Sequence, residues 1–235
     1  MKLTHYGHAC VLMELPGDGG VIRLLFDPGA YSREFEDQVG IDAVLLTHAH
    51  PDHVDAERLG TLLAANPQAE LVLNAHTRTA LAGLLDIAPS RTRIVGPEDT
   101  FVLRGVSVEV VGGDHACIHA ALPTVPNNGY IIDGSLLHPG DALDVAPGPV
   151  EVLLLPVGGP WMKIGEAIDY LRTTAPRLAV PIHQAGLALV HQKMHYGLLR
   201  DLAPEGTEIT VLEHGVPQDV RDAAVSSSHN EGDRR

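Results

Sequence analysis

The sequence predicts an α/β fold in which helices cover a mostly buried β-sheet. Short apolar runs separated by Gly, Pro and Asp turns fill the first third of the chain, as strands do. Other segments repeat apolar residues every three to four positions, which is typical of amphipathic helices. The apolar runs at 43–46 and 152–155 do not alternate with polar residues. Such runs favour central strands that are covered on both faces.

The pattern predicts the elements in chain order. Strands are expected at residues 2–6, 10–15, 21–26, 41–47, 70–74, 106–111, 129–133, 150–155, 178–182 and 207–212. Helices are expected at residues 56–65, 77–85, 164–174 and 190–202. No repeat is visible, so we expect one domain over residues 1–215. The remaining segment, 216–235, is expected to be disordered from about residue 226 because it is polar there.

Composition excludes several classes of protein. Hydrophobic residues make up 45% and charged residues 20% of the 235 residues, as in a globular protein. The net charge of −14 and the lack of a dense Lys/Arg run disfavour a nucleic-acid partner. The first residues lack a signal peptide's apolar core, and no apolar stretch of roughly 18 residues predicts a membrane span. We therefore expect a cytoplasmic protein without membrane contact. The sequence leaves homo-oligomerisation open.

The densest group of metal-ligating residue types follows the strand expected at 41–47. His48 and His50 lie two apart and should point to the same side, whereas Pro51 turns the chain so that Asp52 and His53 can curl back. Imidazole nitrogen and carboxylate oxygen are donors that zinc accepts, and a hydrolytic zinc ion also needs a position open to water. The spacing therefore predicts a metal site.

This His-x-His-x-Asp-His run resembles the signature of the metallo-β-lactamase fold superfamily. Three later segments resemble that family's pattern in the same order: Gly-Gly-Asp-His at 112–115, His-Pro-Gly-Asp at 138–141 and Val-Pro-Ile-His at 180–183. The resemblance covers roughly residues 2–215. It implies a four-layer αββα sandwich and a metal-dependent hydrolase.

The resemblance also implies a ligand set for two divalent metal ions per chain. The first ion would be held by His48, His50 and His115, and the second by Asp52, His53 and His183, with Asp141 bridging the two. Zinc is the expected metal, with manganese as an alternative and iron less favoured. Asp52 would act in catalysis by orienting a water activated by both ions.

The beginning of the chain resembles one branch of the family. Tyr-Gly-His-Ala-Cys at 6–10 and Phe-Asp-Pro-Gly at 26–29 are similar to segments of hydrolases related to ascorbate-6-phosphate lactonase. His8 and Asp27 would then support ligand side chains without binding metal. A strand-end turn is an equally weighted interpretation of Asp27.

Four further residues are candidates for substrate contact. His119 lies four residues after His115. We prefer His115 as the metal ligand because His115 directly follows a predicted strand. The only Trp, Trp161, follows two glycines and suits a pocket rim. Asn128 is expected in a turn near the pocket, and His195 on a polar helix face that could line it.

The leading hypothesis is hydrolysis of a small-molecule ester, lactone or phosphate-containing metabolite. The alternatives are an iron-dependent oxidoreductase or dioxygenase with this fold and a metal-binding module without catalysis. The resemblance places His50 where the diiron oxidoreductases have a Glu, which disfavours the oxidoreductase alternative. All seven expected ligands are present, so the sequence shows no sign that catalysis has been lost, as the metal-binding module would require.

Overall fold

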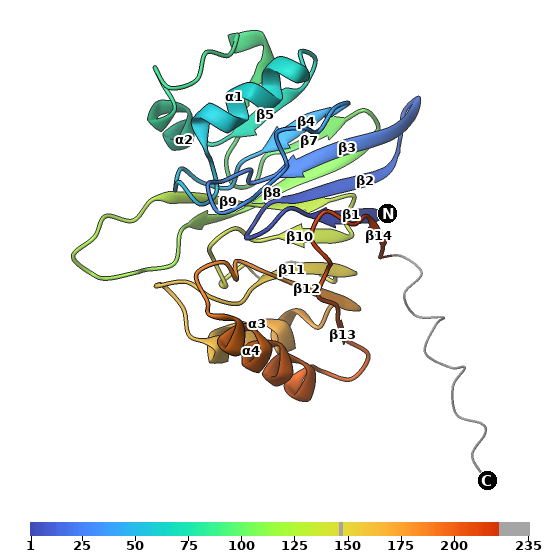
Figure 1. Ribbon diagram of the computed structural model, residues 1–235, viewed down its shortest axis with the longest axis vertical. Coiled ribbons are helices and arrows are strands. Elements are labelled where there is room, and N and C mark those ends of the chain that lie inside the picture. The colour runs from blue at the N-terminus through green and yellow to red at the C-terminus, as the bar shows by residue number, and fades with distance from the viewer. Residues whose placement is uncertain (146–147, 221–235) are drawn as a thin grey trace.

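Two seven-stranded sheets form the centre of the molecule (Figure 1). The computed structural model describes residues 1–145 and 148–220. The first sheet contains β1 (Lys2–His5), β2 (Val11–Gly17), β3 (Gly20–Phe26), β4 (Ala43–Leu45), β5 (Glu70–Leu73), β6 (Thr92–Ile94) and β14 (Gln218–Asp219). The second contains β7 (Thr100–Leu103), β8 (Val106–Asp114), β9 (Pro126–Ile132), β10 (Leu136–His138), β11 (Val152–Pro156), β12 (Leu178–Ile182) and β13 (Glu208–Ile209).

Helices cover the outer face of each sheet. Helices α1 (Ala56–Ala65) and α2 (Ala75–Ala80) lie over the first sheet, whereas α3 (Ile164–Thr174) and α4 (Leu189–Leu202) lie over the second (Figure 1). The four layers match the predicted αββα sandwich. No helix in the described part of the chain is both long and apolar enough to cross a membrane.

Both sheets combine an antiparallel half with a parallel half. The first has the order β14-β1-β2-β3-β4-β5-β6, and its parallel pairs begin with β3 and β4. The second has the order β13-β12-β11-β10-β9-β8-β7, with parallel pairs from β10 to β13. A parallel connection needs a crossover, and helices supply most of these crossovers.

The continuous apolar runs arise because each central strand faces two apolar layers. In β4, Leu45 packs into the layer between the sheets, whereas Val44 packs beneath α1. In β11, Leu154 faces the layer between the sheets and Leu153 the layer beneath α3. Successive side chains of a strand point to opposite faces, so covering both faces requires apolar residues at every position.

The observed elements differ from the predicted ones in several places. The second helix begins earlier than predicted because the Asn74 side chain accepts a hydrogen bond from Thr77 N, and the chain turns left-handed at Gly83 soon after it ends. The predicted strand at 207–212 shortens to β13. β6, β7 and β10 were not expected from the pattern, since they are short.

The first sheet also extends beyond residue 215, where we expected the domain to end. β14 pairs antiparallel with β1, and Val220 N donates a hydrogen bond to Met1 O. The two residues of β14 are polar, so their sequence gave no reason to expect a strand. Pairing with β1 supplies hydrogen-bond partners to their backbone groups. The disorder expected from about residue 226 lies outside the described residues.

Truncation of Leu154 tests the layer between the sheets. Leu154 is fully buried, so Leu154→Ala should lower the free energy of unfolding by about 2 to 5 kcal/mol through lost burial and a cavity. Leu189 is exposed, so Leu189→Ala should lower the free energy of unfolding far less. Chemical denaturation measures both values, and equal costs would contradict this packing.

Candidate metal centre

The candidate ligands come from loops that follow four strands. His48, His50, Asp52 and His53 lie in the loop after β4; His115 follows β8, Asp141 follows β10 and His183 follows β12 directly. Strands β8, β10 and β12 run in one direction in the second sheet, so their carboxyl ends meet at one edge. The loop after β4 brings the first sheet's donors to the same edge.

The donor atoms gather in three overlapping groups. They are His48, His50 and His115; His8, Asp52, His53 and His183; and His48, His53 and Asp141, and within each group one donor atom per residue lies within 4.8 Å of the others. All seven ligands that the sequence predicts therefore lie in one cluster. The only addition among the described residues is His8.

Asp141 lies between the histidines of both predicted metal sites. Its Oδ1 lies 3.1 Å from His53 Nε2, and its Oδ2 lies 3.0 Å from His183 Nε2 and 3.3 Å from His115 Nε2. The carboxyl group is almost fully buried. A carboxylate with imidazoles on both oxygens has the geometry needed to bridge two cations.

Buried acceptors fix the rings of two histidines through Nδ1. His53 Nδ1 donates to Asp27 Oδ2 at 2.8 Å, and Thr47 Oγ1 donates to the same oxygen at 2.8 Å. Because that hydroxyl already donates its hydrogen, it accepts at 2.9 Å from His48 Nδ1. The Nε2 atoms of His53 and His48 are therefore left to face the cluster.

Backbone carbonyls fix two more histidines in the same way. His115 Nδ1 donates to Ala116 O at 2.6 Å, and His183 Nδ1 donates to Gly158 O. In its neutral form, each ring then carries its lone pair on Nε2, as metal-ligating histidines do.

Buried atoms without partners show that this cluster fits a metal. Nε2 of His53, His115 and His183 and Oδ1 of Asp141 are buried and make no hydrogen bond within the described chain. Although His53 Nε2 and Asp141 Oδ1 lie close together, their contact lacks hydrogen-bond geometry. Buried polar atoms without partners are costly, and a cation among them would remove this cost.

Charge in the cluster is balanced by carboxylates. Burial would lower the pKa of His183, but Asp141 and Asp52 raise it to about 9. Burial also opposes charge on His53, yet Asp141 and Asp27 raise its pKa well above the ordinary value. Burial would raise the pKa of Asp141, and His53 and His183 instead hold it well below its usual range. Without metal, protons on His53 and His183 therefore supply the positive charge that a metal cation would supply.

Asn127 holds the backbone of Asp141 in place, a role that the sequence did not indicate. Its Oδ1 accepts a hydrogen bond from Asp141 N at 3.0 Å, and its Nδ2 donates to Pro139 O at 2.9 Å. Gly140 has φ +65°, and a Cβ there would lie 2.2 Å from Asn127 Oδ1. The Gly-Asp pair is therefore required by close packing as well as by turn geometry.

Two predicted substrate residues lie beside the cluster. The Trp161 ring lies 5.8 Å from the rings of His115 and His183 and forms part of a pocket of about 660 Å³. His119 is exposed and lines a smaller pocket of about 190 Å³, which His50 and His115 also line. Both positions permit contact with a bound molecule.

The other two predicted substrate residues make protein contacts instead. Asn128 lies within β9, not in a turn, and its side-chain amide donates to Val95 O at 3.2 Å. It is buried, and it lines a separate pocket of about 370 Å³ that contains none of the predicted metal ligands. His195 Nδ1 donates to Val157 O at 2.8 Å, and its residue does not line either pocket.

Comparison with known proteins defines the class. Residues 2–183 match the Beta-lactamase superfamily domain, so the chain belongs to this family. Protein Rv0786c of Mycobacterium tuberculosis is 44% identical over 221 residues, which cover 92% of this chain and 99% of that protein. A UPF0173 metal-dependent hydrolase of Opitutus terrae is 34% identical and covers 78% of this chain and 84% of its own.

A solved structure shares the fold at low identity. CmlA, a diiron β-hydroxylase from Streptomyces venezuelae, superposes with a TM-score of 0.69 at 17% identity. The match covers 92% of this chain and 53% of that one. At this identity the likeness describes architecture alone.

Metal uptake should release protons at neutral pH. Because the pKa of His183 is raised to about 9, its Nε2 holds a proton below that pH, and a cation must displace it. The apparent zinc affinity should therefore rise with pH towards 9. Calorimetry in buffers of different ionisation enthalpy counts the protons, and His183→Gln should release about one fewer. Affinity independent of pH would contradict the prediction.

Proposed function

We propose that this protein is a hydrolase with two divalent zinc ions, the metal that its nitrogen and oxygen donors favour. His48, His50 and His115 would hold one ion, Asp52, His53 and His183 the other, and Asp141 both. The position of Asp141 between histidines of both groups is the single observation that carries this proposal.

Such ions supply an acidified water, which gives a hydroxide nucleophile near neutral pH, and they stabilise a negatively charged leaving group. The chain's own contribution is to hold the donors before metal arrives. Thr47, Asp27 and the carbonyls of Ala116 and Gly158 fix the imidazole rings, so little reorganisation is needed.

Asp52 is the acid group best placed to act on water. Its side chain is 22% exposed, whereas that of Asp141 is 3% exposed, so solvent reaches Asp52 more easily. Burial would raise its pKa, but the nearby imidazoles of His183 and His8 lower it, so the carboxylate stays ionised. An ionised oxygen can bind a cation and accept a hydrogen bond from water.

The larger pocket sets the size and charge of the substrate. Its volume of about 660 Å³ suits a small molecule, and His115 and Trp161 connect it with the cluster. Its wall also contains the carboxyl groups of Asp114, Asp144, Glu166 and Asp169. No Lys or Arg is among the described residues lining it. Repulsion by these carboxylates favours a neutral or cationic ester or lactone over a phosphate ester.

The test begins with metal content and a substrate panel. Protein purified without added ions is analysed for zinc, manganese and iron, and then assayed with lactones, carboxylic esters, phosphodiesters and thioesters. About two zinc or manganese ions and hydrolysis of an ester or lactone are expected. Absence of metal after reconstitution would overturn the proposal. Iron with oxygen consumption would replace it with the oxidoreductase alternative.

Removal of the shared carboxylate should impair binding of the second ion most. Asp141→Ala takes away the charge that screens repulsion between two cations, so metal content should fall towards one ion per chain. Elemental analysis after gel filtration measures this. His115→Ala should reduce metal content, whereas the exposed His119→Ala should leave it near the wild-type value. The reverse order would show that His119 is the ligand.

Neutralising Asp52 should slow hydrolysis with little effect on folding. Asp52→Asn keeps the shape but removes the charge that orients water, so kcat should fall about 100-fold or more. The exposed Asp86→Asn is the matched control. Turnover, metal content and thermal midpoint are measured together. Near-normal turnover at full metal content would show that water is positioned by another group.

A further inference from the structure

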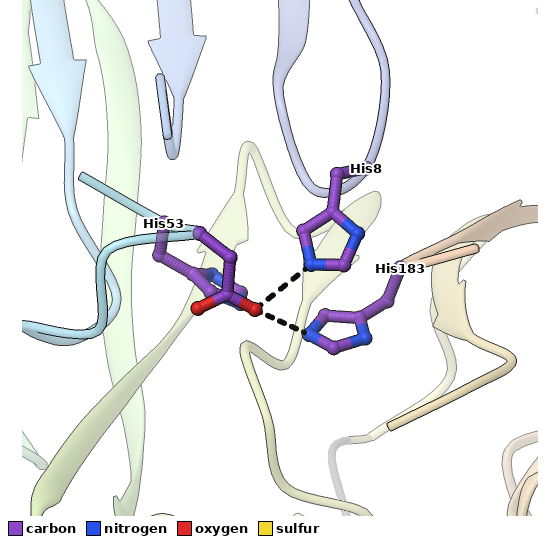
Figure 2. Close-up of side chains that lie close together, drawn as sticks. His8, His53 and His183 are labelled. Carbon is purple, nitrogen blue, oxygen red and sulfur yellow. Dashed lines mark hydrogen bonds and ion pairs between the residues drawn. The ribbon is translucent and has the colours of Figure 1, made fainter. Parts of the chain in front are cut away.

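His8 is the one histidine of the cluster that lies outside the predicted ligand set. It comes from the loop between β1 and β2, far in sequence from the other donors. Its Nε2 lies 3.0 Å from Asp52 Oδ2, the same oxygen that lies 3.5 Å from His183 Nε2 (Figure 2). Position alone therefore permits two roles for His8: a metal ligand or a hydrogen-bond donor to Asp52.

The backbone holds His8 in a conformation that a non-glycine residue rarely adopts. His8 has φ +53°, and it follows Gly7 with φ +99°. Its carbonyl accepts hydrogen bonds from His183 N at 2.9 Å and from His5 Nε2 at 3.0 Å. Left-handed backbone costs free energy, so these contacts are needed to keep the ring where it is.

The ring nitrogens of His8 have the opposite arrangement from those of the histidines described above. Ala185 N donates to His8 Nδ1 at 3.4 Å, and a backbone N–H can only donate, so Nδ1 carries the lone pair. The proton of the neutral ring is then on Nε2, facing Asp52 Oδ2. By contrast, His48, His53, His115 and His183 all donate from Nδ1.

Burial and ring contacts hold the His8 side chain in place. The His8 side chain is 2% exposed, and its ring centre lies 3.9 Å from that of His183 and 5.2 Å from that of Tyr31. A ring wedged between two others cannot turn freely to exchange its nitrogens.

We propose that His8 is a positioning residue that donates its Nε2 hydrogen to Asp52 and is not itself a metal ligand. This role rests on the proposed function of Asp52 as a ligand and water-orienting group. Asp52 is on the more exposed side of the cluster, and His8 makes the shortest contact with its Oδ2, since His183 Nε2 lies 3.5 Å and His53 Nε2 4.0 Å from that oxygen. The hydrogen bond from His8 leaves one carboxylate orientation favoured, with the other oxygen free for cation and water.

A positioning role and a metal-ligand role for His8 predict different effects of two substitutions. A Gln side chain can place an N–H near the position of histidine Nε2, whereas an Asn side chain places one near Nδ1. His8→Gln should therefore keep the bond to Asp52, while His8→Ala and His8→Asn lose it. Asn tolerates left-handed backbone, so His8→Asn also controls for the strained conformation.

The experiment measures zinc affinity for both ions by chelator competition in wild type and the three variants. His8→Ala and His8→Asn should weaken binding of one ion about 10- to 100-fold, the usual effect of removing a residue that orients a ligand. His8→Gln should stay within about 3-fold of wild type, by the same reasoning. His183→Gln, a change at a proposed ligand, and His76→Gln, a change at an exposed histidine, serve as the two controls.

Equal loss of zinc in His8→Gln and His183→Gln would show that His8 is a ligand and overturn the proposal. Wild-type affinity in His8→Ala would also overturn it, because Asp52 would then need no such donor. The thermal midpoints of the metal-free variants separate a general loss of stability from loss of positioning.

Nitrogen-15 NMR of the histidine rings gives a test that depends neither on activity nor on the zinc affinity of a variant. In both metal-free and zinc-loaded wild type, the His8 ring, assigned by the signal missing in His8→Gln, should carry its hydrogen on Nε2. A hydrogen on Nδ1, or a zinc-shifted Nε2, would refute the proposal. Failure of wild type to bind zinc would refute the proposed function instead, and the Nε2 hydrogen on His8 would still be measured.

Discussion

Asp27 is fully buried at the end of β3, and its carboxylate connects three parts of the metal centre. Oδ1 accepts from Thr47 N, and Oδ2 accepts from both Thr47 Oγ1 and His53 Nδ1, each at 2.8 Å. A buried carboxylate must find such donors, because leaving it unpaired is costly. Asp27 therefore fixes the beginning and the end of the loop that carries His48, His50, Asp52 and His53.

The two sheets share the task of building the centre. The first sheet provides the His-rich loop and Asp27, and the second provides His115, Asp141 and His183. The apolar layer between the sheets sets their separation, since interiors pack at near-crystalline density. Asp141 is the residue in which both contributions meet, because its oxygens face histidines from each sheet.

Hydrogen bonding separates four of the five histidines that would hold metal from His8; the fifth, His50, places Nδ1 3.0 Å from His48 Nε2. Four rings direct Nδ1 to an acceptor and present Nε2, whereas His8 accepts at Nδ1 and donates from Nε2. Proximity to the cluster is the same in both cases. The position of a proton is thus more informative about role than distance alone, because one ring nitrogen's partner determines what the other can do.

The sequence by itself determined an α/β fold with a buried sheet and a metal site in the loop at 48–53, whereas the four layers and the other three donors came from the resemblance to the family. The two patterns read from the residues are local: apolar runs indicate strands covered on two faces, and the loop at 48–53 concentrates His and Asp donors. Short strands such as β6 and β10 could not be predicted, because their pairing depends on neighbours distant in sequence.

Only the tertiary structure decided the roles of several side chains. Asn128 turned into the core and Asn127 onto the Asp141 loop, although both stand together in sequence, because alternate residues of a strand face opposite ways. Thr47 gained its role from contacts with Asp27 and two histidines. The orientation of His8 depends on Ala185, 177 residues away in the chain. Hydrogen-bond partners supplied by distant segments leave no local pattern, so the sequence identified the donors while the fold determined which atom each presents.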